Sequence, residues 1–279
     1  MPTADLNGVE LYYETAGTGE LLVLTHGSWT NGSGWAPVVE ILAERYTVVT
    51  WDRRGHSRSQ PGAGPGSRDQ DAADLAALIA HLTDTPVHVA GNSYGAIASL
   101  TLVGTRPELV ASAAVREPPV LALLEGTDDA EIASELGRID QDLAVVASLI
   151  ERDRRRDAAE HFIDRVALGP GSWAQLPEPF KAVLKGNAPT YLDELRDPTS
   201  TSVNLTALAT TSVPLKITLG SESPRIFAAI TDALAMLVPD ARIETIAGAG
   251  HIPYVTHPHQ WADILAAFHA TVPTSGSRR

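Results

Sequence analysis

The stretch that decides the fold runs from Pro86 to Thr105 and reads PVHVAGNSYGAIASLTLVGT. Its first part, from Val87 to Ala90, is a short apolar run that ends at Gly91, which is typical of a buried strand. Its last part carries apolar residues at helical spacing: Ala96, Ile97, Ala98, Leu100, Leu102 and Val103. The stretch therefore predicts a strand, a tight turn and a helix that packs on a sheet.

The five residues in the turn, GNSYG at 91–95, fit the pattern G-x-S-x-G. The two glycines allow the chain to pass from strand to helix so sharply that Ser93 adopts a strained backbone conformation. This geometry lifts the Ser93 hydroxyl above the sheet, near the positive end of the following helix. We interpret Ser93 as a candidate nucleophile rather than a serine in an ordinary turn.

The composition is that of an ordinary soluble globular chain of 279 residues, 44% hydrophobic and 20% charged. The net charge of −13 disfavours nucleic acids and anionic membrane surfaces as partners. The absence of cysteine excludes disulfides, thiolate catalysis and cysteine-based metal sites. No basic and apolar leader is evident, nor an apolar run of the roughly 20 residues that span a bilayer. We therefore expect a cytoplasmic protein without membrane association, and its oligomeric state, including a homodimer, stays open.

Strands and helices alternate along most of the chain. Apolar and alternating patterns predict strands at 9–15, 21–25, 48–51, 87–90, 111–115, 214–219 and 242–246. Helical spacing predicts helices at 35–45, 75–82, 96–103, 226–237 and 261–268. Such alternation implies the α/β class, with a mostly parallel sheet covered by helices on both faces.

One long segment, 118–208, shows no convincing strand. It predicts helices at 132–150 and 158–168, and then short helical pieces between Pro177 and Leu195. An insertion between two sheet strands would lie over the carboxyl ends of the strands, where ligands bind in such sheets. The predicted organisation is a core domain of 1–117 and 209–272, a helical cap of 118–208 and a disordered tail of 273–279.

A serine hydroxyl attacks an acyl carbon only when a neighbouring base takes its proton and an acid orients that base. His251 follows the last predicted strand in the flexible loop AGAGH, which could bring its imidazole over Ser93. Two other histidines, His257 and His259, have no complementary acidic or histidine cluster, so we predict no metal. No phosphate-binding or dinucleotide motif is present either, and no cofactor is predicted.

Four motifs together resemble the α/β-hydrolase superfamily from about Val9 to Ala270: HGSW at 26–29, DRRGHSRS at 52–59, GNSYG at 91–95 and GAGHIP at 248–253. The resemblance implies the α/β-hydrolase fold and hydrolysis by a serine, acid and histidine in that chain order. It also implies that the backbone N–H groups of Ser28 and Tyr94 stabilise the oxyanion of a tetrahedral intermediate. The side chains of Ser28, Trp29 and Tyr94 would then line the pocket.

The acid departs from the usual family pattern, because Ser223 stands where an aspartate is expected after the cap. Two carboxylates compete for the role. Glu222 is adjacent in sequence, whereas Glu117 ends the strand before the cap, where some members of the superfamily carry their acid. We favour Glu117 because that position lies at the carboxyl edge of the sheet, within reach of the His251 loop.

The predicted cap is rich in apolar residues, some of which would roof an apolar pocket. Trp173 and Tyr191 are the candidates for substrate contact. No arginine cluster marks an anionic substrate, so an apolar, medium-sized ester or lactone fits best as the small-molecule partner. Two alternatives stay open: a carbon–carbon bond hydrolase of the same fold, which the missing aspartate disfavours, and a non-catalytic hydrolase-fold protein that only binds a ligand.

Overall fold

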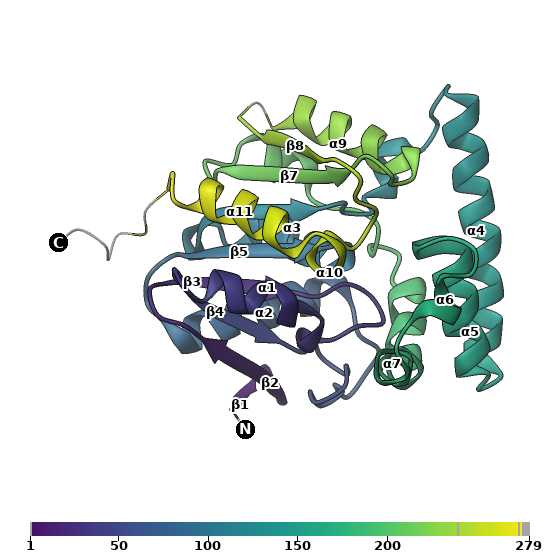
Figure 1. The fold of residues 1–279 in the computed structure, drawn as a ribbon, viewed down its shortest axis with the longest axis horizontal. Coiled ribbons are helices and arrows are strands. Elements are labelled where there is room, and N and C mark those ends of the chain that lie inside the picture. The colour runs from purple at the N-terminus through teal and green to yellow at the C-terminus, as the bar shows by residue number, and fades with distance from the viewer. Residues whose placement is uncertain (1, 239, 273, 275–279) are drawn as a thin grey trace.

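The computed structural model describes residues 2–238, 240–272 and 274, and in these residues one eight-stranded sheet forms the centre (Figure 1). The strand order is β1-β2-β4-β3-β5-β6-β7-β8. The six strands from β4 to β8 in this order run parallel to one another, whereas β2 pairs antiparallel with both β1 and β4. The strands are β1 (Thr3–Leu6), β2 (Val9–Ala16), β3 (Glu20–Thr25), β4 (Tyr46–Trp51), β5 (Val87–Asn92), β6 (Val110–Arg116), β7 (Leu215–Gly220) and β8 (Arg242–Ile246). This arrangement confirms the predicted α/β class.

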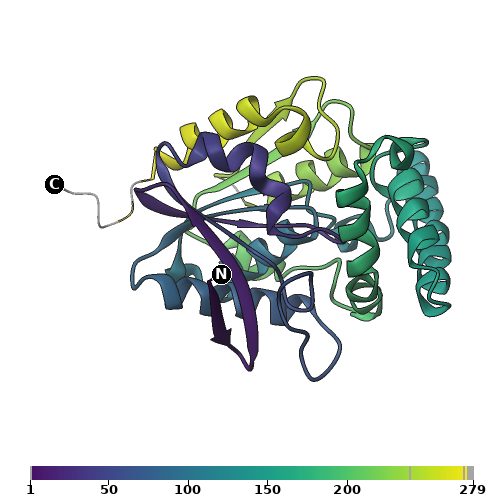
Figure 2. The ribbon, with the colours of Figure 1, turned by 60° about the horizontal axis from the view of Figure 1, so that its bottom comes forward.

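Helices cover both faces of the sheet, as the two views in Figures 1 and 2 show. On one face, α1 (Ala36–Leu42) and α11 (Pro258–His269) share an apolar cluster with the sheet. On the other, α2 (Arg68–Leu82), α3 (Tyr94–Thr105) and α9 (Arg225–Leu237) form a second cluster. Shorter helical turns are η1 (Gly32–Trp35), η2 (Pro107–Leu109) and α10 (Pro253–Thr256). Helix α3 is apolar on all sides and buried at the centre, as its position beside β5 requires.

The chain between β6 and β7 forms helices, and α4 to α7 stand beyond the carboxyl ends of the parallel strands (Figure 1). The elements are η3 (Leu121–Leu124), α4 (Ala130–Glu151), α5 (Arg155–Phe162), η4 (Ile163–Ala167), α6 (Ser172–Gln175), α7 (Glu178–Arg196) and α8 (Leu205–Ala209). Residues 118–208 are termed the helical insertion below. Helices α4, α5 and α7 share their own apolar cluster, and Trp29 from the core joins it.

Helix α7 differs from its prediction, because it is one continuous helix where short pieces were expected. Pro189 lies inside it, although a proline removes one hydrogen bond of the helix and normally kinks or breaks it. The buried side chains of Leu184, Ala188 and Tyr191 pack in the apolar cluster of the insertion and hold the helix together. Tertiary packing thus outweighs the local effect of the proline.

Two further local differences concern short elements. Strand β1 was not predicted, because its four residues include only two apolar ones, and it arises from antiparallel pairing with β2 across a hairpin at Asn7 and Gly8. The helix predicted at 158–168 ends at Phe162 and continues as the π-helical turn η4.

Of the tail predicted to be disordered, 273–279, only Thr274 lies within the described residues. Its backbone N–H and its hydroxyl both donate to the Glu20 carboxylate. No helix in the described part of the chain is long and apolar enough to cross a membrane.

Candidate active site

Ser93 occupies the sharp turn between β5 and α3. Its φ of 55° and ψ of −124° lie in a region that residues with side chains rarely adopt. The turn requires a glycine at position 95, since a Cβ there would collide with the carbonyl oxygens of Thr25 and His26. The backbone N–H of Ser93 donates to the Arg116 carbonyl at 2.8 Å. The serine is therefore held in strained geometry by the two strands that flank β5.

Glu117 directly follows β6, is fully buried, and also has a positive φ of 42°. Its Oε2 lies 2.6 Å from Nδ1 of His251, while its Oε1 accepts the Gly220 N–H at 2.7 Å. Burial alone would raise the pKa of Glu117, but the hydrogen bond and charge of His251, with the charge of Arg116, hold the pKa below its ordinary value. An ionised carboxylate only accepts hydrogen bonds, so Nδ1 of His251 donates and Nε2 is left as an acceptor.

Two other contacts position His251. Phe227 of α9 stacks on the imidazole, with ring centroids 4.9 Å apart and planes 21° from parallel. The buried Arg116 guanidinium pairs with Glu117 at 2.8 Å and also donates to the carbonyl oxygen of Gly250. One arginine thus holds both the acid and the loop that carries the histidine.

The turn after β3 lies directly against the candidate nucleophile, since a Cβ placed on Gly27 would stand 3.1 Å from Cβ of Ser93. His26 supports this turn: its Nε2 accepts the Arg53 N–H at 2.9 Å, so its Nδ1 donates to the Gly27 carbonyl at 2.8 Å. Burial, and next the charge of Arg53, lower the pKa of His26 to about 3, so the ring is neutral at physiological pH.

Ser93 and His251 line one cavity of about 120 Å³, together with Ser28 and Tyr94. Tyr94 is the first residue of α3, so its backbone N–H has no acceptor within the helix. Most of the remaining wall is apolar and includes Leu121, Ile139, Leu143, Phe162 and Ile226. A larger depression of about 810 Å³ adjoins the cavity, and both include His251 and Arg138 in their walls.

The predicted substrate contacts fall in different places. Tyr191 lines the cavity with Ser93, and Trp29 lines a smaller adjoining one. Trp29 is buried, with its ring stacked on Phe162 at 5.3 Å and tilted against Tyr191 at 4.9 Å. Trp173 packs inside the helical insertion instead and belongs to the wall of neither cavity.

The runner-up acid, Glu222, is exposed, and its carboxylate accepts the Ser221 hydroxyl at 3.1 Å. The structure thus brings the carboxylate of Glu117, not that of Glu222, to the imidazole of His251. In the part of the chain that the structure describes, no group of three or more histidine or acidic side chains could hold a metal ion.

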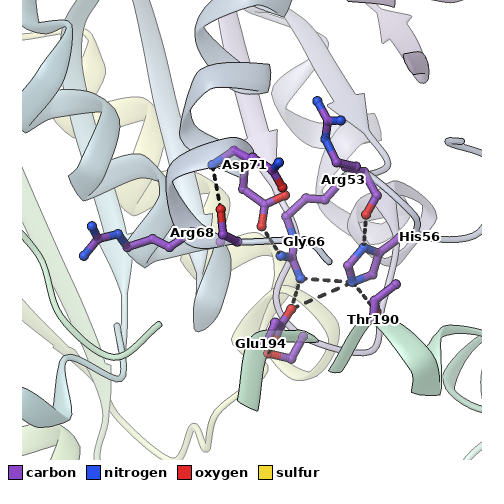
Figure 3. Close-up of polar contacts among 12 residues, drawn as sticks. Arg53, His56, Gly66, Arg68, Asp71, Thr190 and Glu194 are labelled. Carbon is purple, nitrogen blue, oxygen red and sulfur yellow. Dashed lines mark hydrogen bonds and ion pairs between the residues drawn. The ribbon is translucent and has the colours of Figure 1, made fainter. Parts of the chain in front are cut away.

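Sequence reasoning missed a buried charged network beside the cavity (Figure 3). Arg53 lies between two carboxylates, with Nη1 at 2.7 Å from Asp71 and Nη2 at 2.5 Å from Glu194 of α7. Glu194 also accepts the Ser28 hydroxyl at 2.5 Å and lines the cavity of Ser93. Burial raises the pKa of Asp71 to about 6, although Arg53 opposes the shift. The only signal for Glu194 was a polar residue within the apolar face of α7.

Comparison with known proteins identifies the family of the chain. A family model described as the alpha/beta hydrolase family matches residues 22–264. The chain is 38% identical to the uncharacterized hydrolase YraK of Bacillus subtilis over 128 residues. This match covers 45% of this chain and 47% of YraK, so it spans about half the length of that relative. It is 29% identical to the pimeloyl-[acyl-carrier protein] methyl ester esterase of Xanthomonas campestris pv. campestris, over 94% of this chain and 100% of that protein.

Among solved structures, the enol-lactonase from Burkholderia xenovorans LB400 is similar with a TM-score of 0.78 at 18% identity. The match covers 96% of this chain and 100% of that one, and at this identity it shows the fold alone. The family model, by contrast, covers most of the sequence, including the turn that carries Ser93 and the loop that carries His251. The chain therefore belongs to the alpha/beta hydrolase family.

Proposed function

We propose that this hydrolase cleaves an uncharged carboxylic ester or lactone through an acyl-enzyme, with Ser93 as nucleophile, His251 as base and Glu117 as acid. The observation that carries the proposal is the 2.6 Å contact between Glu117 and His251. It lies in a site where the strained Ser93 and His251 line the same cavity. Strained backbone and a buried carboxylate facing an imidazole in a cavity are features that gather at catalytic sites.

In the first half of the proposed reaction, Oγ of Ser93 attacks the carbonyl carbon while Nε2 of His251 takes its proton. Glu117 keeps the imidazole in the required tautomer and offsets the charge of the imidazolium. The N–H groups of Ser28 and Tyr94 stabilise the oxyanion. When the intermediate collapses, the proton on His251 passes to the leaving oxygen and Ser93 stays acylated. Water then attacks the acyl carbon while Nε2 of His251 takes its proton. The proton passes to Oγ of Ser93, and the carboxylic acid product leaves.

The size of the cavity supports a short acyl group. About 120 Å³ is less than the roughly 150 Å³ of an apolar cavity known to bind benzene. The adjoining depression of about 810 Å³ has room for a larger leaving group. Among the charged residues of the cavity wall, Glu194 already pairs with Arg53 at 2.5 Å and Arg138 with Asp142 at 3.1 Å, while Glu135 adds a negative charge, which disfavours a carboxylate on the acyl group. The similarity to a methyl ester esterase over most of the chain also supports ester-bond chemistry.

A substrate panel tests the proposal. We expect hydrolysis of p-nitrophenyl butyrate and of small neutral lactones, and weaker hydrolysis of a p-nitrophenyl ester with a free carboxylate on its acyl chain. In the Ser93→Ala variant kcat should fall by about 10⁵-fold or more. Equal turnover in wild type and Ser93→Ala would reject the nucleophile, and the absence of all hydrolysis in the wild type would favour the ligand-binding alternative.

A further inference from the structure

Helix α7 of the insertion binds the turn of Ser28 at three points. Asn187 donates from Nδ2 to the carbonyl oxygens of Trp29 at 3.0 Å and Thr30 at 2.8 Å. Glu194 accepts the hydroxyl of Ser28 at 2.5 Å. Asn187 and Glu194 are 2% and 6% exposed, so both polar groups are withdrawn from solvent. They lie seven residues apart, about two helical turns, and therefore share one face of α7.

The core fixes each of these two side chains on its other side. Arg53 donates from Nη2 to Oε1 of Glu194 at 2.5 Å (Figure 3). This leaves Oε2 of Glu194 for the hydroxyl of Ser28. The same Nη2 donates to the Gly27 carbonyl at 3.4 Å. Asn187 accepts the backbone N–H of Ser57 at 2.8 Å through its Oδ1. Contacts with the core thus fix the orientation of both Asn187 and Glu194 relative to the turn of Ser28.

The turn needs external support because its backbone is strained. Trp29 has a φ of 67°, and such a conformation in a bulky residue persists only where its surroundings determine it. The N–H of Ser28, one of the two proposed oxyanion donors, belongs to the same turn. An oxyanion donor has to lie about 2.7–3.1 Å from the oxyanion, so a small displacement of the turn weakens this hydrogen bond.

We propose that Asn187 and Glu194 are positioning residues: they hold the turn so that the Ser28 N–H is aimed at the oxyanion. The inference rests on the proposed hydrolytic function and adds to it a role for the helical insertion. Neither residue takes part in bond making, since Asn187 acts through the carbonyls of Trp29 and Thr30 and Glu194 acts through the hydroxyl of Ser28. The insertion then completes the oxyanion site in addition to roofing the cavity.

Ser28→Ala tests this without disturbing the buried ion pair, because it keeps the backbone N–H and removes only the bond to Glu194. We expect kcat for p-nitrophenyl butyrate to fall about tenfold with KM within about threefold, since the lost interaction matters chiefly in the transition state. Asn187→Asp, nearly isosteric but without the two donors, should behave in the same way. Glu194→Gln combined with Ser28→Ala should lower kcat by less than the product of the single effects, because both cut one bond.

The matched control is Asp71→Asn, which removes the other carboxylate from Arg53 but touches no atom of the turn. Its kcat should stay within about twofold of wild type. Wild-type kcat in Ser28→Ala, or an equal loss in Asp71→Asn, would overturn the positioning role even if Asn187→Asp fails to fold. An active wild type with unchanged Ser28→Ala rejects this inference alone, whereas an inactive wild type rejects the proposed function and this inference with it.

Discussion

Two buried glutamates each bind a residue that lines the cavity, one from the end of a sheet strand and one from the helical insertion. Glu117 follows β6 and binds His251 at 2.6 Å, while Glu194 lies on α7 and binds Ser28 at 2.5 Å. Each also pairs with a fully buried arginine, Arg116 at 2.8 Å for the first and Arg53 at 2.5 Å for the second. The geometry of the two contacts is therefore nearly the same.

The two carboxylates differ in the charge of the group that each one faces during the proposed reaction. Glu117 faces a group that becomes positively charged in the proposed reaction, so its own charge stabilises the transition state. Glu194 faces a neutral hydroxyl, so it can contribute only through the position of the turn. Similar bonds thus predict a large effect on the sheet side and a modest one on the insertion side, and the following tests either sharpen or break that contrast.

The largest expected effect is that of Glu117→Gln, which should lower kcat about 10³- to 10⁴-fold because the amide no longer offsets the imidazolium. The matched control, Glu222→Gln, changes an exposed carboxylate that binds only Ser221 among the contacts described, and should retain kcat within about twofold. Steady-state kinetics on p-nitrophenyl butyrate measure both. The reverse outcome would assign the acid to Glu222.

Stability should respond to pH in opposite directions at two carboxylates that pair with the buried arginines, Asp71 with Arg53 and Glu117 with Arg116. The folded pKa of Asp71, at about 6, exceeds its unfolded value of about 3.9, so between these values the folded state binds more protons. Its contribution to the free energy of unfolding therefore falls as pH rises through this window, by about 2–3 kcal/mol. The folded pKa of Glu117 is lowered, so its contribution is present above about pH 4.3 and is lost as pH falls through the folded pKa.

Urea unfolding between pH 3.5 and 7.5 measures these contributions as differences from Asp71→Asn and Glu117→Gln. Relative to wild type, Asp71→Asn should gain stability as pH rises from 4 to 6, whereas Glu117→Gln should gain as pH falls below about 4. Differences that move in the same direction would contradict the assignment of the two electrostatic environments.

The cavity between the two sides predicts a preference for short acyl chains. With about 120 Å³ available, we expect kcat/KM for p-nitrophenyl acetate or butyrate to exceed that for the decanoate about tenfold. Leu143→Ala, which removes a wall residue contributed by the insertion, should reduce this ratio. A preference for long chains in the wild type would show that the insertion opens further than the structure does.

The smallest expected effect concerns the ring that packs on the imidazole. Phe227→Leu keeps an apolar side chain beside His251 but removes the stacking, and should lower kcat about threefold to fivefold. Phe268→Leu, a change of the same kind in the apolar cluster that α11 shares with the sheet, provides the control, because Phe268 lines none of the cavities beside Ser93. Equal losses in both would mean that the stacking has no specific part in orienting the base.

The sheet side could be predicted from the sequence because its signals are local. A strand run, two glycines and a helix identify the elbow of Ser93, and the end of one predicted strand places Glu117 at the sheet edge. The loop after the last predicted strand likewise supplies His251. In each case the side chain lies within a few residues of a strand end, and strand ends in a parallel sheet lie at one edge.

The insertion side could not be predicted, because its contacts join distant parts of the chain. Glu194 reaches Ser28 across 166 residues, and Asn187 reaches Thr30 across 157. Because Pro189 predicts a break in α7, polar residues near it are expected to face solvent. The sequence does place two polar residues two turns apart on the helix face that buries Tyr191. Buried polar groups need hydrogen-bond partners, so this pattern indicates polar partners elsewhere in the chain.

Labelling with a fluorophosphonate, followed by intact-mass measurement and peptide mapping, tests the central claim most directly. The account predicts one adduct per folded chain, located on Ser93, no adduct after denaturation, and much slower labelling in Glu117→Gln. An unlabelled folded wild type, or an adduct on another residue, would contradict it.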